Sequence, residues 1–178
     1  EIGFIAWLIA TFRRVPLHVQ VHTDFLSPEY ARLSLLNRMR VWGAGFILRR
    51  ASGVRVVSQR VKNSIEKHYR LHVPIAILPI FVDVIKFRTA DPIDYSGLRH
   101  QYRFILLVVS RNAPEKNIDL ALKSFKKVAP QDACLIICGD FRHEEDLSAR
   151  IYNFELEPVR LYKVADLVLV PSKYEGYG

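Results

Sequence analysis

The sequence holds few of the residues and runs that mark disulfide-rich, metal-binding and membrane-spanning proteins. Only two of its 178 residues are cysteine, and Cys134 and Cys138 lie four positions apart in the apolar stretch ACLIICGD. That spacing on one face of a strand indicates buried thiols rather than a disulfide or a zinc knuckle. The apolar run at residues 2–12 is too short to span a bilayer, and no signal-peptide cleavage pattern follows it. We therefore expect a cytoplasmic protein.

The sequence also lacks internal repeats and low-complexity tracts, and its composition is that of an ordinary globular protein. Its charge is unevenly distributed: residues 1–89 carry a net charge of +9, and residues 90–178 carry −1. The basic half is expected to face an anionic partner. A nucleic-acid-binding module is one alternative, although the basic residues follow no known recognition pattern.

Hydrophobic periodicity predicts alternating strands and helices in the first 80 residues, with Ser58 as the N-cap of one helix. The predicted elements are a helix at 2–14, a strand at 17–22, a helix at 28–50, a strand at 54–57, a helix at 59–69 and a strand at 75–79. This order is typical of a parallel sheet with crossover helices, the α/β class. Periodicity then fails at residues 81–100, which we interpret as an inter-domain connection.

A second α/β unit follows this connection. The predicted elements are a buried strand at 104–109, a helix at 118–128, a strand at 134–138, a helix at 144–152, a short helix at 159–164 and a buried strand at 167–170. Ligands bind at the carboxyl ends of strands in such sheets, and two predicted strand ends carry suitable residues. The first end leads into the loop 110–117, with Arg111 and Lys116, and the second leads to Gly139. The two cations indicate a diphosphate site, and the alternative is a pair of solvated loop cations.

Several short motifs in this half resemble the retaining glycosyltransferases of the GT-B fold, in particular glycosyltransferase family 4. Arg111 and Glu115-Lys116 match the family's loop after a buried strand, and Glu175-Gly176-Tyr177-Gly178 matches the opening of its later two-glutamate motif. The resemblance implies two incomplete Rossmann-like parallel-sheet domains: residues 1–82 on the acceptor side and residues 101–178 on the nucleotide-sugar donor side, joined by residues 83–100.

The resemblance also implies roles for individual residues. Arg111 and Lys116 would bind the donor diphosphate, and Glu175 would hold hydroxyls of the donor sugar with help from the backbone amides of residues 176–178. His22 ends a strand in the stretch Val-His-Thr-Asp, where the family has a histidine near the reacting centre. Asp24 is a weaker candidate that could instead cap the turn. An exposed loop carboxylate at Glu175 and a structural histidine at His22 are the alternatives.

The implied reaction is transfer of a hexose from a nucleotide sugar, such as a UDP- or GDP-hexose, to a lipid-linked or polysaccharide acceptor, as in cell-envelope polysaccharide synthesis. Anomeric configuration would be retained, and neither a metal nor a further cofactor is expected. The five arginines of the predicted helix 28–50 fit either a solvated face or peripheral binding at the anionic inner face of the plasma membrane. We do not expect a nucleic-acid partner.

The chain departs from the family pattern in three ways. Asn117 replaces the usual glycine, residues 152–164 leave no room for the usual strand and glycine loop, and the N-terminal strand and the second glutamate are missing. We therefore expect a fragment with an internal deletion. A nucleotide-sugar epimerase of the same fold and a catalytically incomplete fragment remain alternatives.

Overall fold

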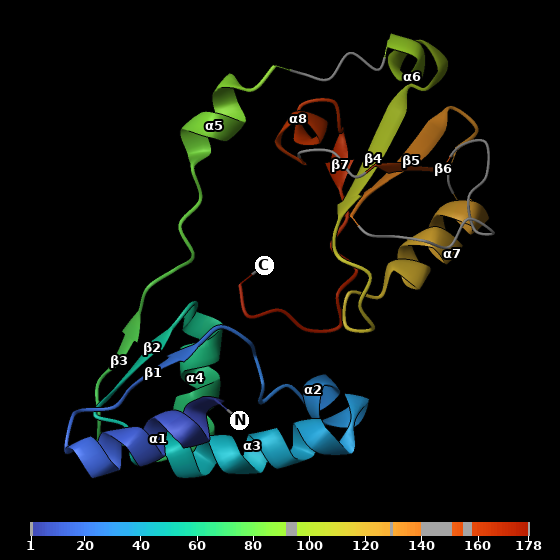
Figure 1. Cartoon of the computed structure of the whole chain (residues 1–178). Coiled ribbons are helices and arrows are strands. Elements are labelled where there is room, and N and C mark those ends of the chain that lie inside the picture. Colours follow the sequence, from blue (N-terminus) through green and yellow to red (C-terminus); the bar gives the residue numbers. More distant parts are fainter. Residues whose placement is uncertain (1, 92–95, 129, 140–150, 155–157, 178) are drawn as a thin grey trace. The chain divides into compact units, whose positions relative to one another are not determined.

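A computed structural model of the chain (Figure 1) describes residues 2–91, 96–128, 130–139, 151–154 and 158–177. The chain forms two compact units, of which the first comprises Glu1–Phe81 with Tyr174–Gly178 and the second Val82–Lys173. The domain boundaries expected from the sequence stay a prediction.

The first unit is built on a three-stranded parallel sheet in the order β1-β2-β3, as the strand and helix pattern predicted. Val19 pairs with Val54, and Val56 pairs with Ile77. The elements are α1 (Ile2–Arg13), β1 (His18–Val21), α2 (Pro28–Leu33), α3 (Leu35–Leu48), β2 (Gly53–Val56), α4 (Gln59–His68) and β3 (Ile75–Ile77).

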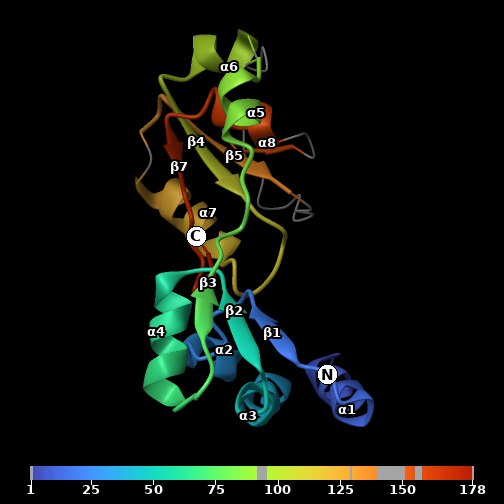
Figure 2. The same ribbon diagram turned by 90° about the vertical axis from the view of Figure 1, so that its left-hand side faces the viewer.

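Alternation along β2 decides which face of this sheet is covered. Val54 and Val56 point into a core shared with Leu48 of α3 and with Val61 and Ile65 of α4. Within the described residues of this unit, α3 and α4 therefore lie on one face of the sheet. Helix α1 lies beside α3, and Figure 2 shows the two helices end-on.

The predicted long helix 28–50 is wrong, because the structure has two helices that meet at Ser34. Ser34 is extended, with φ −163° and ψ 158°, and its hydroxyl accepts a hydrogen bond from the Asn37 backbone N–H at 3.1 Å. The Asn37 side-chain amide donates to the Tyr30 carbonyl at 3.0 Å. A serine N-cap thus begins α3, and the apolar periodicity that continues through the break concealed it.

The second unit contains a four-stranded parallel sheet in the order β6-β5-β4-β7. The elements are α5 (Val84–Thr89), α6 (Ser96–Gln101), β4 (Phe104–Val109), α7 (Ile118–Val128), β5 (Ala133–Cys138), β6 (Ile151–Phe154), α8 (Pro158–Tyr162) and β7 (Leu167–Val168). The predicted strands at 104–109 and 134–138 and the predicted helix at 118–128 are confirmed.

Strand β5 is buried on both faces, so its residues divide between two cores. Leu135 and Ile137 pack against α7, whereas Cys134, Ile136 and Cys138 pack toward α6 and α8 (Figure 1). Burial raises the pKa of the Cys134 thiol to about 11 and raises the pKa of Cys138 as well. The prediction of buried thiols is confirmed, and burial favours the protonated form of both.

Three other predictions for this unit are corrected. Residues 151 and 152, predicted as the end of a helix, belong to β6; the rest of that predicted helix lies outside the described residues. A strand is thus present where a deletion was expected to have removed it. The stretch 83–100 contains α5, capped by the Asp83 carboxylate, and most of α6. Its interpretation as an inter-domain connection stays a prediction. Strand β7 is not buried, because it lies at the sheet edge with Leu167 54% exposed.

Candidate functional site

The loop that follows β4 carries the two cations predicted to bind a diphosphate. The Arg111 side chain is 75% exposed, and its guanidinium donates to the Glu115 carboxylate at 2.9 Å. Lys116 is half-buried, and its backbone N–H closes the turn on the carbonyl of Ala113 at 2.9 Å. The ion pair of Arg111 is exposed to water, which leaves the guanidinium able to exchange Glu115 for a ligand anion at little cost.

Asn117 explains how this loop accepts a residue other than the usual glycine. Its φ is +53°, in the left-handed region that asparagine tolerates better than most residues. Its side-chain amide donates to the Pro171 carbonyl at 3.3 Å, and the Lys173 backbone N–H donates to the Glu115 carbonyl at 2.8 Å. The loop is therefore held in place by the Pro-Ser turn after β7.

Gly139, the weaker candidate at the end of β5, sits in a place that only glycine fits. Its φ is +147°, and a Cβ atom there would lie 2.9 Å from the Ser110 carbonyl carbon and overlap the oxygen. The Ser110 backbone N–H donates to the Cys138 carbonyl at 2.9 Å, so the two strand ends stay together. This close backbone approach accounts for the glycine; a role in binding stays a prediction.

In the first unit, His22 is exposed at the end of β1 beside a cavity of about 250 Å³. Thr23, Tyr30 and Arg40 also line this cavity. Asp24 instead turns into the protein, where it is 8% exposed and its carboxylate lies 3.8 Å from the Arg60 guanidinium. A role for Asp24 in the site stays a prediction.

The Glu175-Gly176-Tyr177 segment belongs to the same unit as His22 and packs on the loop that contains it. A Cβ atom on Gly176 would overlap the His22 carbonyl oxygen and lie 2.7 Å from the carbonyl carbon. The Ser58 hydroxyl donates to the Gly176 carbonyl at 2.8 Å. Glu175 is half-buried and Tyr177 is 45% exposed. The structure thus brings the glycine of the motif against the predicted histidine loop.

Sequence reasoning missed two side chains that hold this segment. Ser58 was predicted only as the cap of α4, where its oxygen accepts from the Val61 N–H at 3.3 Å. Its hydrogen bond to Gly176 joins residues 118 positions apart, and no local pattern indicates such a pair. Tyr30 meets Tyr174 edge-on, with the ring centroids 5.6 Å apart.

The predicted site residues divide between the two units. His22, Asp24, Glu175, Gly176 and Tyr177 belong to the first unit, whereas Arg111, Lys116 and Gly139 belong to the second. Gly178 lies outside the described residues. That all of them line one site stays a prediction.

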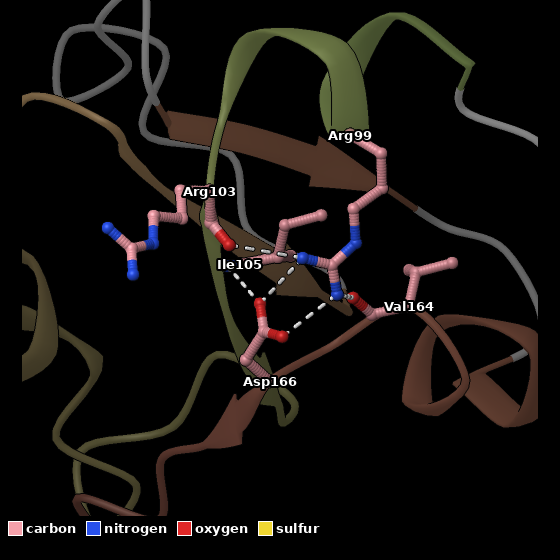
Figure 3. A network of polar contacts seen from close by, with 5 residues as sticks. All are labelled: Arg99, Arg103, Ile105, Val164 and Asp166. Carbon is pink, nitrogen blue, oxygen red and sulfur yellow. Dashed lines mark hydrogen bonds and ion pairs between the residues drawn. The ribbon is translucent and has the colours of Figure 1, made fainter.

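The Ala-Asp that precedes β7 forms a polar network in the second unit (Figure 3). The Arg99 guanidinium donates to both carboxylate oxygens of Asp166, at 2.9 and 3.0 Å, and to the Val164 carbonyl at 2.6 Å. Asp166 also accepts from the Ile105 backbone N–H at 2.7 Å. The network ties α6 to the starts of β4 and β7, and the bonds from Arg99 and Ile105 lower the pKa of Asp166.

Asp166→Asn is expected to destabilise the protein by about 1 kcal/mol at neutral pH, a value discounted because both side chains are partly exposed. A lowered carboxyl pKa contributes stability above the unfolded value, and this contribution is lost as the pH falls through the folded value. The difference in thermal unfolding between wild type and Asp166→Asn should therefore shrink as the pH falls below 3.8, and it should disappear once the Asp166 carboxyl is protonated in the folded state. A difference that persists in acid would contradict this electrostatic origin.

Two family profiles match the chain, one in each half. The profile of Glycosyltransferase Family 4 matches residues 2–86, and that of Glycosyl transferases group 1 matches residues 95–178. Together the two profiles match nearly the whole chain, which thus has a glycosyltransferase family 4 domain followed by a glycosyl transferases group 1 domain. No curated protein sequence matches the chain.

Solved structures of the GT-B kind resemble the chain over almost its whole length. Anabaena HepE, in a complex with UDP and glucose, has a TM-score of 0.74 and 24% identity, and the match covers 99% of this chain and 52% of HepE. Sucrose-phosphate synthase from Thermosynechococcus elongatus has a TM-score of 0.75 and 17% identity, with 99% and 49% covered. Trehalose 6-phosphate synthase from Burkholderia multivorans has a TM-score of 0.65 and 15% identity, with 99% and 50% covered.

These comparisons confirm the predicted family and the predicted α/β fold of GT-B type. They also show that the chain spans about half the length of the structures it matches.

Proposed function

We propose that the complete protein transfers a hexose from a nucleotide-sugar donor to a lipid-linked or polysaccharide acceptor. The observation that carries the proposal is the close packing of the Glu-Gly-Tyr segment on the His22 loop. This packing leaves no room for a side chain at position 176. This contact brings the backbone of the motif against the backbone of His22. Anabaena HepE, a similar structure, was obtained with UDP-glucose, which favours a UDP-hexose donor here as well.

The chemistry of transfer explains why the loop after β4 needs cations. Breaking the bond between the anomeric carbon and the phosphate leaves negative charge on the departing diphosphate. The planar fork of Arg111 suits two phosphate oxygens, and Lys116 adds a point charge. Fixed charges of this kind need no reorganisation during the reaction, so we propose that transfer requires no metal or further cofactor.

We propose roles for the remaining residues on the same chemistry. Glu175 would hold hydroxyls of the donor sugar, and the amides of residues 176–178 would assist. His22 would bond a sugar hydroxyl or share a proton near the anomeric carbon. On the resemblance to family 4, we propose that transfer proceeds by front-face attack with retention of configuration.

We further propose that the protein works in the cytoplasm, at the inner face of the plasma membrane, in cell-envelope polysaccharide synthesis. Support comes from the net charge of +9 in residues 1–89 and from the arginines of α3. None of the helices in the described ranges is long and apolar enough to cross a membrane. Binding to the membrane would therefore be electrostatic and interfacial for the part of the chain described.

The proposal is tested by incubating the complete protein with a panel of UDP- and GDP-hexoses. One donor should raise the melting temperature and be converted to free nucleoside diphosphate, with the same rate after addition of EDTA. Epimerised donor without diphosphate release would indicate an epimerase instead. Failure of every nucleotide sugar to bind or react would refute the proposal.

A further inference from the structure

The outer face of α3 is unusually apolar for a helix surface in contact with water. Leu35, Met39 and Trp42 are 75%, 68% and 82% exposed. Their spacing of four and then three residues places them on one stripe of the helix. An exposed tryptophan in a stripe of this kind is typical of a surface that meets another apolar phase.

A cationic groove lies beside this stripe, between α3 and the end of α4. It encloses about 620 Å³ and includes Trp42 in its wall. The groove is lined by Arg38, Val41, Trp42, Gly45, Phe46, Arg49, Arg50, His68 and Tyr69. These described lining residues include three arginines and a histidine but no carboxylate, so an anion entering the groove meets a positive potential.

The arginines of this groove are positioned without being neutralised. Arg50 lies over the Phe46 ring, 3.5 Å from its centroid, and donates to the Phe46 carbonyl at 3.1 Å. Arg49 lies 5.2 Å from the centroid of the Tyr69 ring. Arg38 donates to the Ala31 carbonyl at 3.3 Å. The ion pairs among the described residues include none of these three, so their charge stays available.

Tyr69 fixes the shape of the groove. Its hydroxyl donates to the Val41 carbonyl at 3.2 Å, which joins the end of α4 to the middle of α3. Its ring also fills the space beside Gly45, where a Cβ atom would lie 2.8 Å from Cε1 of Tyr69. The groove is therefore part of the folded unit rather than a gap between loose side chains.

We infer that this groove binds the phosphate headgroup of an anionic phospholipid, while Leu35, Met39 and Trp42 enter the interfacial layer of the membrane. Arginine guanidinium binds phosphate bidentately, and tryptophan favours the boundary between headgroups and acyl chains. Apolar side chains and arginines on adjoining surfaces match the two parts of a lipid. The inference rests on the membrane association proposed above but not on the transfer reaction.

The test is sedimentation of the complete protein with vesicles of phosphatidylcholine, with and without phosphatidylglycerol, in the absence of nucleotide sugar. Wild type should bind the anionic vesicles preferentially. Exchanging both groove arginines, Arg49→Gln with Arg50→Gln, should weaken this binding at least about tenfold, and Trp42→Ala should weaken it about fivefold. The double variant Lys67→Gln, Arg70→Gln removes the same charge from the same unit outside the groove and should bind nearly as well as wild type.

Each alternative outcome overturns a definite part of the inference. Equal losses in the two double variants would show that net charge alone acts. Unchanged binding of the groove and Trp42 variants would leave membrane association intact but place it elsewhere on the protein. Absence of vesicle binding by wild type would refute both the groove and the membrane association. Circular dichroism of each variant verifies folding, and donor turnover tests the reaction separately.

Discussion

Replacing Arg111 by alanine in the complete protein is expected to slow nucleotide-sugar turnover about a hundredfold, equivalent to about 3 kcal/mol of transition-state stabilisation. The reason is the loss of the planar donor that meets charge on the leaving diphosphate. The melting temperature should hardly change, because the Arg111–Glu115 ion pair is on the surface, with Arg111 75% exposed. Steady-state release of nucleoside diphosphate measures the effect.

A charge-matched control separates this effect from a general change in potential. Lys123 is exposed on α7 of the same unit, and Lys123→Ala should leave turnover within about twofold of wild type, as expected for an exposed charge. Unchanged turnover in Arg111→Ala would remove Arg111 from the reaction. A large fall in melting temperature together with the loss of turnover would instead make Arg111 a structural residue.

Gly176→Ala is expected to have the second large effect, a loss of turnover of tenfold or more, since overpacking costs about 1–3 kcal/mol. The added methyl group would overlap the carbonyl oxygen of His22, so the Glu-Gly-Tyr segment must leave its seat. The hydrogen bond from Ser58 to the Gly176 carbonyl would be lost with it. Donor binding and turnover are both measured, because both should fall.

The control for this prediction is Gly97→Ala in α6. A Cβ atom at Gly97 meets nothing within 4 Å, and alanine is the better helix former there by about 0.5–1 kcal/mol. This variant should be at least as stable as wild type and equally active. Normal turnover of Gly176→Ala would show that the reaction does not depend on the observed packing of the Glu-Gly-Tyr segment on the His22 loop.

The parts of the fold that could be predicted from the sequence are those with one strong local signal. Strand β4 is a continuous apolar run, and α7 has a clear helical stripe, so both were predicted within their observed bounds. The break at Ser34 was missed because apolar residues continue at helical spacing on both sides of it. Strand β7 has the composition of a buried strand, but its exposure depends on its place at the sheet edge, which sequence does not show.

The candidate site shows the same limit. From the sequence, Asn117 was only a departure from the family's usual glycine. Its φ of +53° explains why either glycine or asparagine fits, because both tolerate the left-handed backbone conformation. The backbone amides of residues 176–178 were predicted to help to hold the donor sugar, and the sequence did not indicate the close approach of Gly176 to the backbone of His22. Contacts of this kind join distant parts of the sequence, so no local sequence pattern indicates them.

The most direct test of the account is the affinity of the complete protein for a nucleoside diphosphate relative to the bare nucleoside, measured by calorimetry. If Arg111 and Lys116 hold the diphosphate, the double variant Arg111→Ala, Lys116→Met should lower the affinity for the diphosphate at least about tenfold, as expected for the loss of two charged hydrogen-bond donors. The affinity for the nucleoside should not change. An unaltered ratio of the two affinities would contradict the claim that this loop binds the donor diphosphate.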